Sequence, residues 1–473
     1  MQVASTAINQ QIEAFLQGEK SFDLPFDLTL SKNSGYQCSE VLRLLPSKRL
    51  VLRAMQNDQN VVIKLFSAAK KGEREFNKEI RGHALALAAG ADVPSLISSH
   101  ANVDGYYAVV YEFLDNAQSF ADKAIWGNKD NILALFSLTA KLHEYGTYQD
   151  DIHFDNLMLR DGKLFLIDLG SVECEREGEP LSNAKSLKNL ARLVAQFPPL
   201  EQAQIIQSLS HYYLLRNWQC NDEAHELFVK QLKQAWQRRK KEYLNKCFRT
   251  CTMTKYGRTF SAEYAFRRDF INEISVDLIN DVEALMSQGD VLKAGNSATV
   301  VRVKIDGIDL VVKRYNIKNV WHLLRRTLRQ SRAAVSWRNA NLLEFIDLPT
   351  LKPLGFIERR QGWFRSVAYF ISEYHQAEEL LDVYHSRQPT ESELEQINNI
   401  FLLMQNSQIS HGDLKAQNLL IDAAGKVILI DLDAMQEHTS YRRFQRAFNK
   451  DKKRFIRNWQ DMNIKETFTS LIF

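Results

Sequence analysis

The sequence predicts an α+β protein of two tandem domains, each with a β-rich amino-terminal lobe and a helical carboxy-terminal lobe. The chain carries one pattern of acidic and amide residues twice, at 149–170 and 411–433, and each copy has an aspartate after a short apolar run. Strand-like segments that hold a lysine precede each copy, followed by a helix-like stretch. A chain of 473 residues is long enough for two domains that each bury a core. We therefore expect domains at 1–248 and 286–473, joined by a connection at 249–285.

The repeated pattern has the spacing of a protein-kinase-like catalytic loop followed by a metal-binding aspartate. The residues are Asp151, Asn156 and Asp168 in the first copy, and Asp413, Asn418 and Asp431 in the second. Phosphoryl transfer needs a positioned hydroxyl and a divalent cation held by hard oxygen ligands. We therefore predict that Asp151 and Asp413 accept the proton of an attacking hydroxyl, and that the other four residues bind Mg²⁺. A chance arrangement of surface Asp and Asn is the alternative, and the repetition of the whole pattern argues against it.

The first half has the parts of a nucleotide-binding lobe. Residues 61–66 form a strand-like run that contains Lys64, and residues 75–90 form an amphipathic helix-like run that contains Glu79. In kinases a strand lysine paired with a helix glutamate holds the α- and β-phosphates of ATP, so we expect Lys64 to pair with Glu79. The preceding strand segment, 42–55, has no glycine in its turn, unlike the glycine-rich loop that contacts phosphates in kinases.

The second half repeats this lobe with a different loop. Residues 291–315 are predicted to form three strands joined by two turns, with Lys313 near the end of the third. We expect Lys313 to contact the ATP phosphates and the backbone of the first turn to approach them. That turn contains Gly295, Asn296 and Ser297. Because one glycine is a weak signal, an ordinary hairpin is the alternative.

Two further β-rich runs, 106–115 and 367–376, end in acidic and aromatic residues. We expect them to form the hinge strands that present backbone groups to an adenine, although either run alone is also typical of a buried strand. The order of lysine strand, helix, hinge strand, helical stretch and catalytic loop is the same in both halves.

The second half resembles the lipopolysaccharide kinase family, the bacterial core heptose and Kdo kinases with a protein-kinase-like fold. The segments that carry the resemblance are 313–318, 331–343, 349–355, 411–420 and 429–435. The first half resembles the same superfamily less specifically. The resemblance implies an ATP- and Mg²⁺-dependent phosphotransferase whose acceptor is a sugar hydroxyl of the lipopolysaccharide inner core or another glycolipid. It also implies that the reaction occurs at the cytoplasmic face of the inner membrane.

Several residues depart from the kinase pattern. Gln149 stands where the loop usually has a His, and His153 stands where the second copy has Lys415, which we expect near the ATP phosphates. A His at this place resembles the loop of antibiotic and choline phosphotransferases, which favours a small or sugar hydroxyl. In the second copy Ser336 lies near the expected helix glutamate, and Asp433 replaces a Gly, as a further metal ligand or as the cap of a turn. Whether one copy is an inactive regulatory or scaffold domain therefore stays open.

The composition, with 45% hydrophobic and 25% charged residues, is that of an ordinary globular protein. The five cysteines are scattered without zinc-ligand spacing, so we expect reduced thiols. The amino terminus has no signal-peptide pattern and no window approaches the ~20 apolar residues that span a bilayer. We therefore expect a cytoplasmic protein.

Two segments, 321–332 and 441–459, combine basic residues with apolar residues at helical spacing. Such helices can contact an anionic membrane surface or a phosphorylated glycolipid. The alternative is that the apolar stripes pack on the helical lobe while the bases face solvent. No nucleic-acid-binding motif accompanies the bases, so we do not expect a nucleic-acid partner.

Three functions remain open from sequence alone. The first is phosphorylation of a lipopolysaccharide sugar, and the second is a protein kinase or small-molecule kinase. The third is a pseudokinase scaffold in envelope glycolipid assembly. The presence of Asp, Asn and Asp in both copies argues against a complete loss of chemistry, because a scaffold does not need a metal-bound triphosphate.

Overall fold

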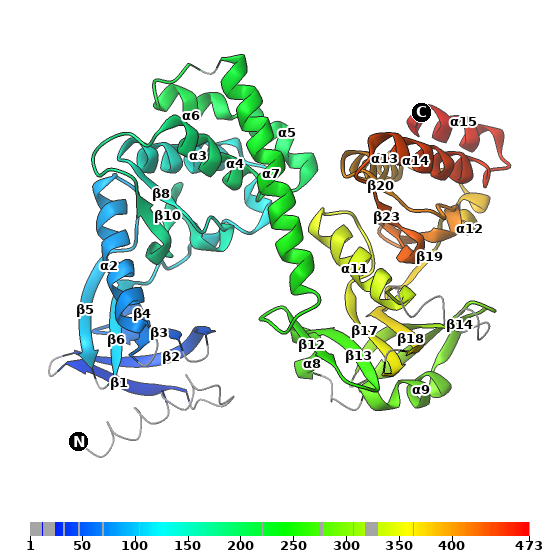
Figure 1. Ribbon diagram of the computed structural model, residues 1–473, viewed down its shortest axis with the longest axis horizontal. Helices are drawn as coiled ribbons and strands as arrows, with labels where there is room; N and C mark the ends of the chain where they lie inside the picture. The colour runs from blue at the N-terminus through cyan, green and yellow to red at the C-terminus, as the bar shows by residue number, and fades with distance from the viewer. Residues whose placement is uncertain are drawn as a thin grey trace. The chain divides into compact units, whose positions relative to one another are not determined.

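The computed structural model describes Ile12 and residues 24–31, 34–45, 48–68, 71–103, 105–219, 221–273, 278–305, 307–316, 330–362 and 364–472. The chain folds into two compact units (Figure 1). The first comprises residues 1–197 and 201–236, and the second comprises residues 198–200 and 237–473. Both units contain antiparallel sheets and helices, so the predicted α+β class is confirmed.

The first unit begins with a six-stranded antiparallel sheet in the order β1-β2-β3-β4-β6-β5. Its strands are β1 (Phe26–Ser31), β2 (Ser34–Leu45), β3 (Arg49–Gln56), β4 (Gln59–Ser67), β5 (Leu96–Val103) and β6 (Tyr106–Glu112). Strands β3 and β4 are joined by Asn57 and Asp58, both with positive φ, as a tight hairpin turn requires. The predicted lysine strand is therefore β4, and the predicted hinge strand of this half contains β6.

Helix α2 (Gly72–Ala88) follows β4 and lies against the turn η3 (Leu169–Ser171). A Cβ atom at Gly82 would lie 1.8 Å from the carbonyl oxygen of Leu169, so this approach requires a glycine. The helix thereby brings Glu79 close to the segment that contains Asp168.

The rest of the first unit is mainly helical, with a core of apolar side chains that includes Phe136, Phe154 and Phe197. Its helices are α3 (Lys129–Glu144), α4 (Asn183–Val194), α5 (Pro199–Gln207), α6 (Leu209–Leu215) and α7 (Asp222–Lys246). Five short strands accompany them: β7 (Gln118–Ser119), β8 (Thr147–Gln149), β9 (Leu157–Arg160), β10 (Lys163–Leu166) and β11 (Val172–Cys174). The division between the units lies within α5 and α7.

The second unit contains a seven-stranded antiparallel sheet in the order β12-β13-β17-β18-β16-β15-β14. Its strands are β12 (Thr254–Arg258), β13 (Ala262–Arg267), β14 (Asp290–Ala294), β15 (Ala298–Ile305), β16 (Ile308–Tyr315), β17 (Pro353–Gln361) and β18 (Phe364–Glu373). Its helices α8 (Arg268–Glu273), α9 (Leu278–Gln288) and α11 (Arg332–Phe345) accompany this sheet. Strands β12 and β13 come from the segment expected as a connection, and β13 pairs with β17 inside the sheet.

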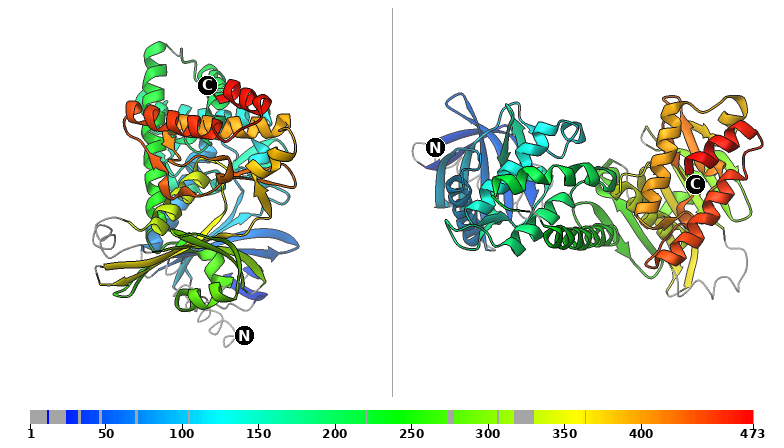
Figure 2. Two further views of the ribbon diagram at one scale, coloured as in Figure 1. Left: turned by 90° about the vertical axis from the view of Figure 1, so that its right-hand side faces the viewer. Right: turned by 90° about the horizontal axis from the view of Figure 1, so that it is seen from above.

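The second unit ends in helices α12 (Leu380–Ser386), α13 (Glu391–Asn406), α14 (Tyr441–Ile456) and α15 (Met462–Ile472). Helices α13, α14 and α15 pack side by side (Figure 2). A capping box between Thr390 and Glu393 fixes the start of α13. The short strands are β19 (Ala377–Glu379), β20 (Ile409–Ser410), β21 (Leu419–Asp422), β22 (Val427–Leu429) and β23 (Gln436–Glu437).

The apolar stripe of the segment 441–459 is buried inside this unit. Phe444, Phe448, Phe455 and Trp459 pack against one another and against Phe401. Most of the other basic segment, 321–329, lies outside the described residues. No helix in the described part of the chain is long and apolar enough to cross a membrane.

Candidate active sites

Lys64 occupies a buried position at the inner face of β4 in the first unit. Its Nζ atom lies 2.6 Å from Oε1 of Glu79 and donates a second hydrogen bond, 2.8 Å long, to the carbonyl oxygen of Ile167. Glu79 is fully buried, and its other oxygen has no hydrogen-bond partner among the described residues. One lysine therefore links the sheet, helix α2 and the strand end that precedes Asp168.

The loop from β8 to β9 holds the other predicted residues of the first unit. Asn156 donates from Nδ2 to the carbonyl oxygen of Asp151 at 3.2 Å, and the backbone N–H of Ile167 donates to the carbonyl oxygen of Asn156 at 3.0 Å. Asp168 lies 3.6 Å from Arg49 and 3.9 Å from Arg43, both on the preceding sheet. The structure thus brings Asn156 and Asp168 together at one edge of the loop.

Gln149 takes the place of the usual loop His and makes a comparable link. Its Nε2 atom donates to the carbonyl oxygen of Asp168 at 2.8 Å, and its Oε1 atom accepts from the Ser171 hydroxyl at 2.8 Å. In the second unit the Nε2 atom of His411 lies 2.9 Å from the carbonyl oxygen of Ile430, the residue before Asp431. An amide and an imidazole therefore connect the catalytic loop to the same strand end.

The candidate catalytic loop of the second unit repeats the contacts of the first. Asn418 donates from Nδ2 to the carbonyl oxygen of Asp413 at 2.7 Å, and the N–H of Ile430 donates to the carbonyl oxygen of Asn418 at 2.9 Å. In both copies the amide nitrogen of the Asn side chain is engaged by the loop, which leaves the amide oxygen as the atom that can face a cation.

Asp431 differs from its counterpart because it contacts the strand lysine directly. Its Oδ1 atom accepts a 2.5 Å hydrogen bond from Nζ of Lys313, and its backbone has a φ of 63°. Burial raises the pKa of this carboxyl, but the charge and hydrogen bond of Lys313, together with the charges of His411 and Arg332, lower it overall. The contact with Lys313 therefore favours the carboxylate form of Asp431.

No helix glutamate pairs with Lys313 within the described part of the second unit. Ser336 is buried and bonds the hydroxyl of Tyr315 at 2.8 Å, and Glu344 forms an ion pair with Arg267. The described residues of the second unit therefore contain no counterpart of the lysine–glutamate pair of the first unit.

Asp433 instead forms an ion pair with Arg332 at the start of α11. Burial raises the pKa of Asp433, although Lys313 and Arg332 oppose that effect. Asn339 of the same helix donates to the carbonyl oxygens of Leu432 and Met435. Asp433 and Asn339 therefore fix helix α11 to the segment that follows Asp431.

The candidate base of the second unit is surrounded by two cations. Arg454 donates from Nη1 to Oδ1 of Asp413 at 2.8 Å and to the carbonyl oxygen of Gly412 at 2.7 Å. Lys415 lies 3.0 Å from the other carboxylate oxygen. Sequence reasoning found Lys415 but missed Arg454, because nothing in a basic helical segment indicates which of its bases turns toward the loop.

A second residue of α14 was also missed. Asp451 is buried and accepts hydrogen bonds from the backbone N–H groups of His411 and Gly412 at 2.7 and 3.1 Å. A signal for it was present in the sequence. Asp451 is the one acidic residue of a strongly basic segment and lies at the helical position of the apolar stripe.

The candidate base of the first unit has a simpler environment. Asp151 is exposed, and no ion pair to it occurs among the residues that the structure describes. The neighbouring Asp150 pairs with Arg192 at 2.8 Å, and His153 turns toward Asp155 at 3.0 Å. The two copies therefore share the loop backbone and differ in the charges around the base.

The turn predicted to approach phosphates joins β14 to β15. Gly295 bonds the carbonyl oxygen of Ala298 through its N–H, and its own carbonyl accepts from the side chain of Asn316 at 3.2 Å. The N–H of Asn316 also donates to the carbonyl oxygen of Ser297 at 3.1 Å, while Asn296 is exposed. The turn is thus fixed to the end of the strand that carries Lys313.

The candidate residues offer carboxylate and amide oxygens, a ligand type that Mg²⁺ accepts. No group of three or more His, Cys, Asp or Glu side chains that could hold a metal occurs in the described residues. Mg²⁺ usually takes one or two protein oxygens and completes its shell with phosphate oxygens and water. The pairs Asn156 with Asp168 and Asn418 with Asp431 supply such a set.

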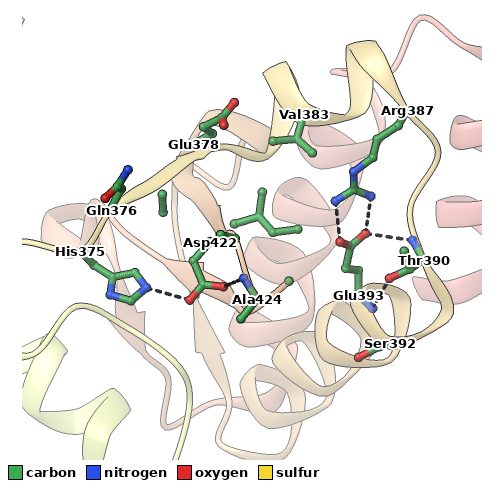
Figure 3. Close-up of a pocket in the computed structure, with 14 residues that line it drawn as sticks. His375, Gln376, Glu378, Val383, Arg387, Thr390, Ser392, Glu393, Asp422 and Ala424 are labelled. Carbon is green, nitrogen blue, oxygen red and sulfur yellow. Dashed lines mark hydrogen bonds and ion pairs between the residues drawn. The ribbon is translucent and has the colours of Figure 1, made fainter.

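A groove of about 960 Å³ lies elsewhere in the second unit (Figure 3). Its polar walls include His375, which bonds Asp422 at 2.8 Å, and Arg387, which is paired with Glu393. None of the predicted site residues lines it. His375 and Gln376 of its lining end the run 367–376, which is predicted to form the hinge, so the groove adjoins that run.

Comparison with known proteins gives one family and a solved structure. Residues 282–469 match the lipopolysaccharide kinase (Kdo/WaaP) family. A structure of WaaP in complex with acyl carrier protein is similar at 16% sequence identity, over 42% of this chain and 88% of that chain, with a TM-score of 0.31. No curated protein matches the chain. The predicted resemblance to a family of lipopolysaccharide kinases is thus confirmed for residues 282–469, which contain Lys313, Asp413, Asn418 and Asp431.

Proposed function

We propose that the protein is an ATP- and Mg²⁺-dependent phosphotransferase that phosphorylates a sugar hydroxyl of the lipopolysaccharide inner core. One observation carries this proposal. Within the residues that match the kinase family, Lys313 contacts Asp431, and Asn418 connects the strand end before Asp431 to the loop of Asp413. These groups are the cation, the metal ligands and the base that phosphoryl transfer uses.

In this proposal each residue has a defined task. Asp413 accepts the proton of the sugar hydroxyl, and Lys415 and Gly295 to Ser297 face the phosphates. Lys313 leaves Asp431 and turns to the α- and β-phosphates, while Asn418 and Asp431 offer their oxygens to Mg²⁺. Bound Mg²⁺ would neutralise the negative charge of the β- and γ-phosphates.

We also propose that the first unit is a second kinase-like domain, so that the chain is a tandem of two bilobal domains. The buried contact of Lys64 with Glu79, together with the loop of Asp151 and Asn156, supports this. Asp168 then offers the carboxylate to the metal. The domain limits 1–248 and 286–473 stay predictions.

The acceptor determines where we expect the reaction to occur. A lipopolysaccharide precursor is a glycolipid of the inner membrane, so we place the reaction at the cytoplasmic face of that membrane. The residue match to the lipopolysaccharide kinase family supports this choice over a protein or small-molecule acceptor.

The test of this proposal compares acceptors. Purified lipopolysaccharide core, a mixture of bacterial proteins and a set of aminoglycosides are each incubated with labelled ATP and Mg²⁺. We expect label only in the lipopolysaccharide core. Label in a protein or an aminoglycoside alone would support the second hypothesis, and ATP binding without any transfer would support the scaffold hypothesis.

Arg454 should act as a positioning residue for the base. Since its guanidinium contacts Gly412 and Asp413 at once, we expect Arg454→Ala to lower kcat by about 10²-fold through misplacement of the carboxylate. The KM for ATP should stay unchanged. Arg454→Lys should recover part of kcat because it restores the charge without the two-pronged contact. An equal loss in both variants, or a change in KM alone, would contradict this role.

A further inference from the structure

Helix α14 has two different faces. One face carries Phe444, Phe448, Asp451 and Phe455, all buried in the second unit. The three aromatic side chains pack with Phe401 and with one another. The apolar face is thus buried in the core of the second unit and cannot insert into a bilayer.

The opposite face is basic and exposed. Its residues are Arg442, Arg446, Lys450, Lys453 and Arg457, and we call them the basic face. They follow one another at intervals of four, four, three and four residues, so they share one side of a helix. No ion pair to any of the five occurs in the described part of the chain. The acidic residue of the helix, Asp451, is buried on the other side and bonded to the catalytic loop.

The same helix contacts the candidate base. Arg454 follows Lys453 of the basic face and donates to both Gly412 and Asp413. A partner that binds the basic face therefore contacts the same helix whose Arg454 holds Asp413 in place. The charge of this face fits an anionic partner, and its row of long, flexible side chains fits a laterally mobile array of headgroups better than a pocketed ligand.

We propose that the basic face of α14 docks the protein on the anionic headgroups of a phospholipid bilayer. This inference rests on the proposed function, because a glycolipid acceptor presents its sugar at a membrane surface. Since the apolar side of the helix is buried, the attraction is electrostatic and involves no insertion. Binding should therefore require anionic lipid and should weaken steeply as salt screens the charges.

The test measures co-sedimentation of the full chain with vesicles. One vesicle set contains phosphatidylcholine alone and the other also contains phosphatidylglycerol. The test variant is the triple substitution Arg442→Glu, Arg446→Glu and Lys450→Glu. The control is Lys129→Glu, Lys163→Glu and Lys188→Glu, which changes the net charge equally at three exposed positions of the first unit. Circular dichroism and thermal unfolding check that both variants fold.

We expect the wild type and the control to bind phosphatidylglycerol vesicles at low salt, and the α14 variant to bind at least about tenfold more weakly. High salt should release all three. Equal binding by both triple variants would overturn the proposal, and so would equal binding to vesicles of phosphatidylcholine alone. If the basic face binds an acidic protein but does not bind vesicles, its partner is a protein. That result would also overturn the proposal.

A second readout separates this inference from the proposed function. Transfer is compared for acceptor embedded in anionic vesicles and for a lipid-free core oligosaccharide. We expect the α14 variant to lose far more activity on the embedded acceptor than on the free one. If the wild type transfers to neither acceptor but binds vesicles through the basic face, the proposed function fails and the docking surface stands. If the wild type transfers phosphate to both acceptors but does not bind vesicles, the docking surface fails and the proposed function stands.

Discussion

Asp413→Asn should lower phosphate transfer by roughly 10²- to 10⁴-fold, the usual contribution of a general base. Asn keeps the shape of the side chain and an oxygen for the contact with Arg454, but it cannot accept the proton of the hydroxyl. The fold should survive because the Asp413 side chain is 37% exposed and its two cation contacts lie near the surface. Steady-state transfer from labelled ATP measures the effect.

The control for this variant is Asp382→Asn, which removes one charge from an exposed position of α12 in the same unit. It should leave transfer unchanged. Asp151→Asn reports on the other unit, and its effect should be confined to whatever reaction the first unit catalyses. If Asp413→Asn retained full activity while Asp151→Asn abolished it, the catalytic unit would be the first and our assignment would be wrong.

Glu79→Leu should destabilise the first unit by about 3–5 kcal/mol, because it leaves the ammonium group of Lys64 buried without a counter-charge. Glu79 is fully buried and the Lys64 side chain is only 10% exposed, so solvent cannot replace the lost contact. Urea unfolding followed by fluorescence measures the loss. The double variant Lys64→Met with Glu79→Leu should recover much of it, since it removes both charges.

A matched control exists on the same helix. Lys78 of α2 pairs with Glu173 at 3.1 Å, but both side chains are more than 40% exposed. Glu173→Gln should therefore cost at most about 1 kcal/mol. Equal losses from Glu79→Leu and Glu173→Gln would show that the buried pair does not stabilise the unit as we infer.

The geometry of the two candidate loops could be predicted because their residues are close in the sequence. Asp, Asn and the second Asp lie within one loop and one hairpin, so their spacing alone places them close together, and the structure joins Asn156 to Asp151 as it joins Asn418 to Asp413. The contact of Lys64 with Glu79 was also predictable, because a strand followed directly by a helix brings the two residues together.

The residues that sequence reasoning missed act across long separations. Arg454 and Asp451 reach the catalytic loop from a helix about 40 residues further along the chain, and no spacing rule indicates that approach. The partner of Lys313 was uncertain for a related reason. Ser336 occupies the expected helix position but turns to Tyr315, and the lysine contacts Asp431 instead.

The strand content of residues 254–267 was also not predicted. The segment lacks a clear period, yet β13 lies inside the seven-stranded sheet and pairs with β17. Pairing with distant strands stabilises such a segment, so its own sequence does not reveal its structure.

The central claim is that the second unit transfers phosphate to a sugar of the lipopolysaccharide core. The most direct test incubates purified core lipopolysaccharide with labelled ATP and Mg²⁺, using wild type, Asp151→Asn, Asp413→Asn and the double variant, and maps the product by mass spectrometry. We predict phosphate on an inner-core sugar with wild type and Asp151→Asn, and none with the two variants that lack Asp413. An unmodified core with the wild type, or an undiminished product with Asp413→Asn, would contradict the account.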